Sequence, residues 1–590
     1  MKIHRNARCP CGSGKRFKHC CGRSDDNQPQ TVTAAEAMKI AAHLQQNGQL
    51  ANAEAIYRQI LQIQPDEAQV YHQLGKTLFA QNQVVEAIHC YQQALQLQPD
   101  LVGVHKDWGD IFRIQGQLAA AKTCFQRVLE LDPTDSGTRI KLATLRPVIM
   151  GQHQNILAFR QQFENQLDNL LTQPLQLDYP ERETGVTNFY LAYHGLNDKT
   201  LQLKLAQLYE QVCPALLYVA PHCQSNSAPI APKKIKIGFV SRFFKNHTIA
   251  KVMSGIIANL SREQFEVYVF FFPQPLDESV AFLQQQADHF ATLPLVLATA
   301  RQQIAAKQLD ILFYPDIGMD SFTYFLAFSR LAPVQCTTWG HPVTTGIRHI
   351  DYFISTVDLE TPASDEHYTE QLVRLPSQIT FYYKPDLPPS FSKTRHDFGL
   401  AKSAHLYICP QALFKFHPDF DEVLAHILTR DSLGLVLLVE GFHHHWTELL
   451  KQRFQQTIPT VSERIRFLPR MSLSDYFNLL ALAEVMLDPF PFGGGNTSYE
   501  ALALGIPIVT LPTSLLRGRF TYASYRQMGI MDCVATNPQH YVEIAIKLGT
   551  TPSYRESIRQ KILAQHQVLY EDIRVVRELE QFFLAAVKAG

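Results

Sequence analysis

The sequence lacks the two features that most directly mark membrane proteins and nucleic-acid-binding proteins. No run approaches the roughly 20 uninterrupted apolar residues that span a bilayer. The 54 basic side chains are balanced by 54 acidic ones, so the formal net charge is +0. A balanced charge gives no electrostatic footprint for nucleic acid or for anionic lipid. We therefore expect neither nucleic acid nor a membrane among the partners.

Signals for export and for a disulfide framework are lacking as well. The N-terminal stretch MKIHRNARCPCGSGK has no apolar core of a signal peptide. Four of the 11 cysteines lie within the first 21 residues and the other seven are scattered singly, which is not a disulfide pattern. We expect a cytoplasmic protein. Its 590 residues exceed the ~250–300 that one core serves, which predicts several domains.

Residues 1–23 form a small unit of their own. Within RCPCGSGKRFKHCCG, the pair Cys9 and Cys11 precedes the pair Cys20 and Cys21 across a glycine-containing basic turn. Four thiolates in two close pairs can close a tetrahedral zinc site, which supplies folding free energy to so short a segment. The stretch resembles the zinc-binding motif at the tail of the preprotein translocase motor ATPase. Because the fourth ligand of that motif is often histidine, His19 competes with Cys21.

A repeat of 34 residues follows a polar linker. Four sets of residues recur at this interval: Pro65, Pro99 and Pro133; Tyr57, Tyr91 and Phe125; Ala53, Ala87 and Ala121; and Ala41, Gly75 and Gly109. Small residues let two helices cross closely, the aromatic ring fills the gap, and proline ends the second helix. The pattern resembles the tetratricopeptide repeat, with units at 34–67, 68–101 and 102–135 inside a domain spanning 33–150. Helical residues 136 to 172 are expected to cap it, and the resemblance implies a groove for an acceptor protein or peptide.

The periodicity changes after a helical connector and hinge at residues 151–232. From Lys234 onward, short runs such as KIKIGFV, FEVYVFFF, DILFYP, HLYICP and VMLDPF alternate with helical stretches. Such alternation predicts parallel sheets in two doubly wound domains, 233–390 and 391–590. The fold class is thus α + α/β. Two such domains facing a cleft suit a two-substrate transferase, because ligands bind beyond the carboxyl ends of parallel strands.

The segment VMLDPFPFGGGNTSYEALALGIPIVTLP reads as strand, glycine-rich loop, helix and strand. Glycines at 493, 494 and 495 let the backbone approach a ligand closely, and a helix then begins. A helix N-terminus attracts a diphosphate through free N–H groups and the helix dipole. The residues expected to bind it are Gly494, Gly495, Asn496, Thr497 and Ser498, with Glu500 accepting hydrogen bonds from a ribose. The loop matches neither a Walker A loop nor a dinucleotide fingerprint, and a purely structural loop is the alternative.

Residues 234 to 586 resemble the catalytic region of the protein O-linked N-acetylglucosamine transferases, a family that also contains bacterial cytoplasmic asparagine glucosyltransferases. The matching stretches include IGFVSRFFKNHTIAKVM, LAPVQCTTWGHPVTTGIRHIDYFIST, YICPQALFKFHPD and the glycine loop. The resemblance implies two facing Rossmann-like domains of the GT-B type and a UDP-sugar donor bound mainly by the C-terminal one. It also implies transfer without a catalytic metal.

The resemblance also implies roles for individual residues. Lys415 in LFKFHP matches the family's essential lysine, which stabilises the charge of the leaving diphosphate. His247 in KNHTIAK matches the histidine on the acceptor side, where it is a candidate base or positioning group; a helix cap is the alternative. Asp316 in YPDIGMD ends a strand and is a further catalytic candidate. His341, Thr344 and Gly346 in WGHPVTTG are expected to line the sugar site.

Several positions depart from the animal enzymes. A glycine followed by Asn496 and Thr497 replaces the family's His-Thr-Thr, and Leu473 and Tyr476 replace the residues that flank uracil. The family's glutamine ahead of the lysine falls at Ala412, with Gln411 one residue away. These changes keep a uridine diphosphate donor but leave the sugar open.

Two sets of metal-ligating side chains are interpreted as structural. Asp419 and Asp421 lie in the acidic first turn of an expected helix, where aspartates are favoured. The adjacent His443, His444 and His445 cannot all face one ion on regular structure. No catalytic metal is expected.

Three functions remain in view. The first is transfer of N-acetylglucosamine from a UDP-sugar to Ser or Thr of a protein held by the repeats. The second is UDP-glucose-dependent glucosylation of asparagine. The third is a non-catalytic repeat scaffold, against which the intact Lys415 and Glu500 argue.

Overall fold

The computed structural model describes residues 33–589 apart from 47, 186, 225–233 and 389. The expected zinc knuckle with Cys9, Cys11, Cys20 and Cys21 lies outside these residues and stays a prediction. The chain divides into two compact units, Met1–Leu145 and Arg146–Gly590.

The first unit contains the helical repeat that the 34-residue period predicts. Its helix pairs begin at Ala34, Ala68 and Val102, at intervals of one repeat. The helices are α1 (Ala34–Gln46), α2 (Leu50–Ile63), α3 (Ala68–Ala80), α4 (Val84–Leu97), α5 (Val102–Gln115), α6 (Leu118–Leu131) and α7 (Ser136–Ala143). The prediction of three tetratricopeptide helix pairs is confirmed.

Glycine and an aromatic ring form the packing unit of each later repeat. A Cβ atom added to Gly75 would lie 2.6 Å from the ring of Tyr91, and one added to Gly109 would lie 2.6 Å from the ring of Phe125. Carbon atoms pack at about 3.5–4.0 Å, so only glycine admits the ring at these positions. Tyr91 and Phe125 are at most 1% exposed, which confirms them as core residues.

The cap of the repeats is shorter than the expected 136–172. Helix α7 packs on α6, whereas α8 (His153–Leu171) packs on α10 (Lys199–Val212) in the second unit. The chain between α7 and α8 is not helical and contains Pro147, which has no N–H to continue a helix.

The first lobe of the second unit is built on a seven-stranded parallel sheet with the order β3-β2-β1-β4-β5-β6-β7. Its strands are β1 (Ile235–Val240), β2 (Phe265–Phe271), β3 (His289–Thr292), β4 (Ile311–Tyr314), β5 (Val334–Thr338), β6 (Tyr352–Thr356) and β7 (Gln371–Leu375). The direction of the strand order reverses between β1 and β4. Ligands of such sheets bind at this switch point, beyond the carboxyl ends of the strands.

The second lobe has a five-stranded parallel sheet with the order β10-β9-β8-β11-β12. Its strands are β8 (His405–Ile408), β9 (Gly434–Val439), β10 (Ile465–Leu468), β11 (Val485–Leu487) and β12 (Ile508–Val509). The switch point of this sheet lies between β8 and β11. The loops after these two strands carry Lys415 and the three glycines.

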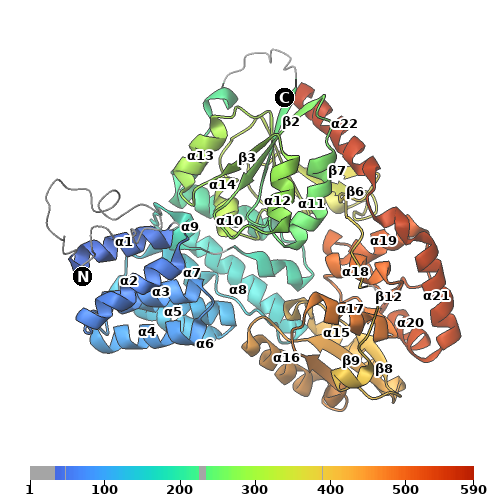
Figure 1. Ribbon diagram of the computed structural model, residues 1–590. Helices are drawn as coiled ribbons and strands as arrows, with labels where there is room; N and C mark the ends of the chain where they lie inside the picture. The colour runs from blue at the N-terminus through green and yellow to red at the C-terminus, as the bar shows by residue number, and fades with distance from the viewer. Residues whose placement is uncertain (1–32, 47, 186, 225–233, 389, 590) are drawn as a thin grey trace. The chain divides into compact units, whose positions relative to one another are not determined.

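Helices cover the two sheets (Figure 1). The first lobe has α11 (Thr248–Asn259), α12 (Glu278–Gln286), α13 (Leu297–Ala305) and α14 (Ser321–Leu326). The second has α15 (Pro418–Arg430), α16 (His444–Thr457), α17 (Leu473–Leu482), α18 (Asn496–Ala503), α19 (Phe520–Met528), α20 (Pro538–Thr550) and α21 (Pro552–Gln565). The last helix, α22 (Ile573–Ala589), returns to the first lobe and packs on α11 and β7. A helical repeat followed along the chain by two Rossmann-like lobes confirms the predicted fold class.

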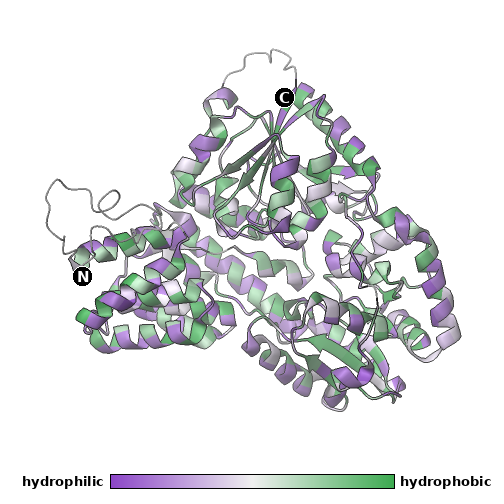
Figure 2. Cartoon of the chain, viewed as in Figure 1, coloured by the Kyte–Doolittle hydropathy of each residue, from purple (hydrophilic) through white to green (hydrophobic). Residues whose placement is uncertain are grey.

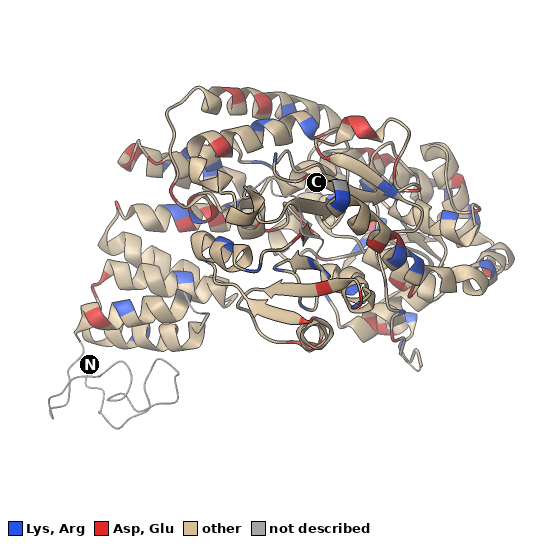
Figure 3. Ribbon diagram, turned by 90° about the horizontal axis from the view of Figure 1, so that it is seen from above, with Lys and Arg blue, Asp and Glu red and all other residues tan. Residues whose placement is uncertain are grey.

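The strands are apolar because helices cover both faces of each parallel sheet. Figure 2 shows β8 and β9 in the colour of hydrophobic residues, and Leu406, Leu437 and Leu438 in them are fully buried. Basic and acidic residues are interspersed along the helices (Figure 3), as the balanced composition requires. None of the described helices is long and apolar enough to cross a bilayer.

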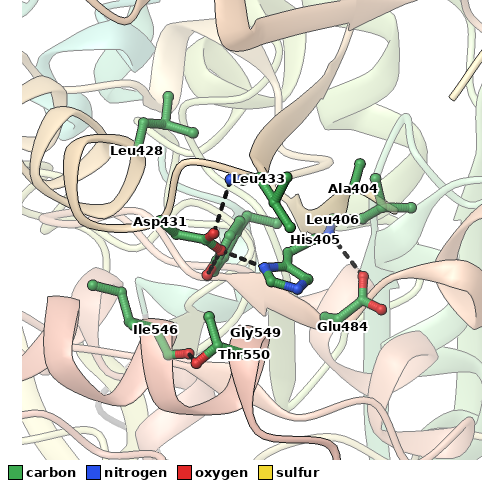
Figure 4. Close-up of polar contacts among 12 residues, drawn as sticks. Ala404, His405, Leu406, Leu428, Asp431, Leu433, Glu484, Ile546, Gly549 and Thr550 are labelled. Atoms are coloured by element: carbon green, nitrogen blue, oxygen red, sulfur yellow. Dashed lines mark hydrogen bonds and ion pairs between the residues drawn. The ribbon is translucent and has the colours of Figure 1, made fainter. Parts of the chain in front are cut away.

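A buried carboxylate fastens the amino end of β8, at the edge of the sheet opposite to the switch-point loops (Figure 4). Asp431 Oδ2 lies 2.8 Å from His405 Nδ1 and accepts a hydrogen bond from the Tyr407 hydroxyl at 2.8 Å. Its Oδ1 accepts the N–H of Leu433 at 3.1 Å. These contacts tie β8 to the end of α15 and to the residue before β9.

We expect Asp431→Asn to lower the free energy of unfolding by about 2 kcal/mol, because a neutral amide cannot serve all three donors and a buried polar group left unpaired is costly. Urea unfolding followed by circular dichroism measures this loss. An unchanged unfolding midpoint would mean that the cluster does not stabilise the lobe.

Candidate functional site

The switch-point loops of both lobes bring together residues that are distant in the sequence. After β1 and β4, the Ser241 hydroxyl donates to Asp316 Oδ2 at 2.8 Å. After β8 and β11, the Lys415 ammonium donates to the carbonyl of Gly493 at 2.8 Å. Asp316 and Lys415, two of the predicted site residues, therefore lie at the carboxyl edges of their own sheets.

A small cavity lies between the lobes. The glycine loop and the start of α18 form one wall, and the first lobe forms the other. The lining residues are Trp339, Leu359, Gln378, Ile379, Gly494, Gly495, Ser498, Tyr499, Phe520 and Ser524. Three of the predicted donor-binding residues thus face the cleft.

Helix α18 begins at this cavity without a side-chain cap, because its N-cap residue is Gly495. The hydroxyls of its first turn are held in place. Thr497 Oγ1 accepts from Gln411 Nε2 at 2.6 Å, and Ser498 Oγ lies 2.9 Å from the hydroxyl of Thr521. A helix N-terminus that lacks a side-chain cap leaves N–H groups for an anion.

Lys415 lies next to this helix start. Its Nζ donates to Gln411 Oε1 at 3.0 Å and lies 4.7 Å from the centroid of the Phe492 ring. Burial lowers the pKa of Lys415 to about 8, although the nearby Asp488 opposes the shift. The ammonium is therefore charged at pH 7 and poorly hydrated. Gln411 makes these contacts, while Ala412 is exposed.

Asp488 is a site residue that the sequence reasoning missed. It follows β11 and lies beneath the glycine loop, where its Oδ1 accepts the N–H of Gly494 at 2.6 Å. Its Oδ2 accepts from the hydroxyl of Thr510 at 2.8 Å. Burial raises the pKa of Asp488, and its backbone and hydroxyl donors counter this effect. The sequence signal for Asp488 was its place as a lone acidic residue after the apolar residues of VMLDPF.

Glu500 joins the two lobes. Its carboxylate is 3% exposed, accepts from Asn496 Nδ2 at 2.7 Å and lies 3.0 Å from the ammonium of Lys251 on α11. The Tyr382 hydroxyl donates to Asn496 Oδ1 at 2.5 Å. Lys251 was also missed, and its position one turn after His247 was the only signal for it.

His247 caps α11, as one of the alternatives anticipated. Its Nδ1 accepts the N–H of Ile249 at 3.2 Å. Burial lowers the pKa of His247 to about 4, so the ring is neutral at pH 7. A neutral imidazole whose Nδ1 accepts a hydrogen bond carries its proton on Nε2. The remaining nitrogen of His247 is then a donor, which favours the positioning alternative over the base.

Asp316 is fully buried, and burial raises its pKa to about 8. The side chain is therefore mostly a neutral carboxylic acid at pH 7. A protonated group cannot accept a proton from an acceptor hydroxyl.

We expect Asp316→Asn to retain activity within about threefold, because the amide keeps the shape and the neutral state of the protonated acid. Loss of a general base would instead cost about 10²–10⁴ in rate. Initial rates of UDP release at pH 7 decide between the two, and a hundredfold loss would restore Asp316 as the base.

Thr344 and Gly346 are not among the residues that line this cavity, and their place at the sugar site stays a prediction. The Thr344 hydroxyl donates to Glu370 at 2.6 Å, and a Cβ on Gly346 would lie 2.4 Å from the carbonyl oxygen of Gln202. Both residues anchor the loop inside the first lobe. His341 Nδ1 lies 3.0 Å from the carbonyl of Ile317, in the loop that also carries Asp316.

One described group has metal-ligand composition: His153, His417 and Asp419, with ligand atoms within 4.8 Å of one another. His417 Nδ1 accepts the N–H of Asp419 at 3.3 Å and caps α15. Its lone pair is thus engaged at the positive end of a helix, which disfavours a cation. Asp421 forms a two-point ion pair with the buried Arg453, so this aspartate has a structural role.

Family models match most of the chain. The model of glycosyl transferase family 41 matches residues 195–384 and 388–573. Tetratricopeptide repeat models match residues 33–100 and 109–135, and the SEC-C motif matches residues 5–23.

Curated relatives include a probable UDP-N-acetylglucosamine–peptide N-acetylglucosaminyltransferase SEC of Arabidopsis thaliana, 24% identical over 65% of this chain and 41% of that protein. A UDP-glucose:protein N-beta-glucosyltransferase of Actinobacillus pleuropneumoniae is 27% identical over 47% of this chain and 44% of that protein. The chain spans less than half the length of these relatives.

Among solved structures, a mutant of the O-GlcNAc transferase of Thermobaculum terrenum has a TM-score of 0.68. It is 22% identical, and the match covers 95% of this chain and 100% of that one. This likeness supports the fold of the repeats and the two lobes.

Proposed function

Because the chain belongs to glycosyl transferase family 41, we propose that it transfers a sugar from a uridine diphosphate donor to a protein in the cytoplasm. The observation that carries the proposal is the Lys415 ammonium beside the start of α18, 2.8 Å from the glycine-loop carbonyl of Gly493. A charged amine and a helix N-terminus without a side-chain cap together form a site for a diphosphate.

The donor is held by the second lobe. Its diphosphate lies against the first turn of α18 and Lys415, and its ribose hydroxyls donate to Glu500. The ribose competes there with Lys251 and Asn496, which hold the carboxylate in the free protein. Leu473 and Tyr476 stand at the positions for the base.

Transfer breaks the bond between the sugar and the diphosphate. Negative charge grows on the leaving group, and a preorganised ammonium in a poorly hydrated site stabilises it more than water does. Lys415 supplies this stabilisation without a catalytic metal. His247 orients the acceptor or the sugar with its Nε2 proton.

The acceptor is a polypeptide held by the repeats. The relative from Arabidopsis thaliana is named for N-acetylglucosamine transfer to a peptide, which favours this sugar for the first candidate. The relative from Actinobacillus is named for glucose transfer to nitrogen, which supports asparagine glucosylation as the second candidate.

The experiment is mass spectrometry of a cell lysate incubated with the purified protein and either UDP-N-acetylglucosamine or UDP-glucose. We expect a mass increment with one donor only, on Ser or Thr for the first candidate and on Asn for the second. The matched negative control is the Lys415→Ala protein. Absence of an increment with both donors would contradict the proposal and favour a repeat scaffold.

A further inference from the structure

A buried ion cluster joins the connector to the second lobe. Asp198, at the start of α10, has a fully buried side chain. Its Oδ1 accepts from Arg160 Nη1 at 2.6 Å, and its Oδ2 lies 3.0 Å from Arg517 Nη2. Arg517 is 3% exposed, and burial lowers its pKa while Asp198 opposes the shift. Without such a partner the buried guanidinium would be an uncompensated charge, which strongly destabilises a fold.

Arg517 also contacts the glycine loop. Its backbone carbonyl accepts the N–H of Gly493 at 2.9 Å, and its Nη2 donates to the carbonyl of Leu196 at 2.5 Å. The connector contacts the loop directly as well, because a Cβ on Gly195 would lie 2.5 Å from Pro491. Residues 195–198 of the connector therefore pack against residues 491–493 of the glycine loop.

Aromatic packing extends this support to Lys415. The Tyr193 ring lies 4.6 Å from that of Phe492 and 4.8 Å from that of Phe414. Phe414 precedes Lys415, and Phe492 lies under its ammonium. The Phe492 ring and the Gly493 carbonyl both contact Lys415. Both belong to the glycine loop, which the connector holds.

We propose that the connector segment 193–198 is a positioning element of the donor site. Asp198 acts through Arg517 to fix the glycine loop, and the loop sets the location of the Lys415 ammonium. The catalytic consequence rests on the function proposed above, whereas the positioning of Lys415 does not.

A merely structural role for Asp198 predicts a different result. The control is Asp431→Asn, which neutralises another buried carboxylate. Asp431 lies at the edge of the second-lobe sheet that is opposite to the glycine loop. This substitution should destabilise the lobe without changing the position of Lys415. A change in Lys415 that both Asp198→Asn and Asp431→Asn produce would result from loss of stability. A change that only Asp198→Asn produces would result from loss of positioning.

The first readout is the titration of Lys415 in the full chain, obtained from its rate of acylation at a series of pH values with peptide mass spectrometry. We expect the Lys415 pKa to rise by about one unit in Asp198→Asn, as the displaced ammonium regains water. Asp488 and Cys409, the other charged or ionisable neighbours, are unchanged. Loss of the Asp198 charge alone would shift the pKa downward, so the sign identifies the cause.

The second readout is steady-state kinetics with the UDP-sugar. We expect Asp198→Asn to lower kcat about tenfold or more with the donor KM within about threefold, since misplacement of a catalytic group by 1 Å can cost about a hundredfold. Asp431→Asn should leave both values within twofold. Tyr193→Leu, which introduces no unpaired charge, should act in the same direction as Asp198→Asn and replaces it if that variant does not fold.

An unchanged or lowered Lys415 pKa in Asp198→Asn or Tyr193→Leu overturns the proposal. Equal kinetic effects of Asp198→Asn and Asp431→Asn overturn it too. Should the wild-type protein turn over no UDP-sugar, the function proposed above fails, and the Lys415 titration still decides whether the connector positions the ammonium.

Discussion

Replacement of Lys415 by alanine is expected to lower kcat by about 10³, with a much smaller change in donor affinity. The ammonium faces charge that grows only as the sugar leaves, and removal of one such preorganised donor typically costs about 10²–10³. The initial rate of UDP release from the donor measures the loss. The pH dependence gives a second test: since burial lowers the Lys415 pKa to about 8 in the free protein, kcat/KM, which reports ionisations of the free enzyme, should fall as pH rises through that value.

The matched control is Lys451→Ala. Lys451 lies on α16 of the same lobe and pairs with Glu448 at 3.0 Å, outside the cleft. It should retain wild-type rates. Activity of Lys415→Ala above about a tenth of wild type, or an alkaline limb that persists unchanged in it, would show that another group stabilises the leaving diphosphate.

Replacement of Glu500 by alanine is expected to weaken UDP binding about a hundredfold. Its carboxylate can accept hydrogen bonds from both ribose hydroxyls, and hydrogen bonds to a charged group contribute about 1.5–3 kcal/mol each. The variant also loses the contact with Lys251 at 3.0 Å across the cleft. Equilibrium dialysis with labelled UDP measures the affinity.

Glu422→Ala is the control for this variant, because Glu422 is an exposed residue of α15 in the same lobe. Its UDP affinity should equal that of the wild type. Equal affinities of Glu500→Ala and wild type would mean that the nucleotide does not reach the first turn of α18.

Local patterns were sufficient to predict the repeats and the alternation of strands and helices. The 34-residue spacing follows from the packing of Gly75 on Tyr91 and of Gly109 on Phe125, which is internal to each repeat. The glycine loop was likewise predictable, because a strand, three glycines and a helix start are contiguous in the chain. These features depend on neighbours in sequence.

Contacts between distant segments were not predictable. Lys251 and Glu500 are brought together by the cleft, and Asp198 reaches Arg517 through the connector. Protonation states were equally hidden, since the pKa shifts of His247 and Asp316 arise from burial by the whole lobe. The contacts of Thr344 with Glu370 and of Gly346 with Gln202 likewise join segments that are distant in the sequence.

Titration calorimetry of the full chain with UDP tests the central claim most directly, since the proposed sugar transfer depends on a diphosphate bound between Lys415 and the start of α18. The account predicts saturable binding of one UDP per chain, weakened about a hundredfold in Glu500→Ala. Absence of binding heat with UDP and with both UDP-sugars, from a folded protein, would contradict it.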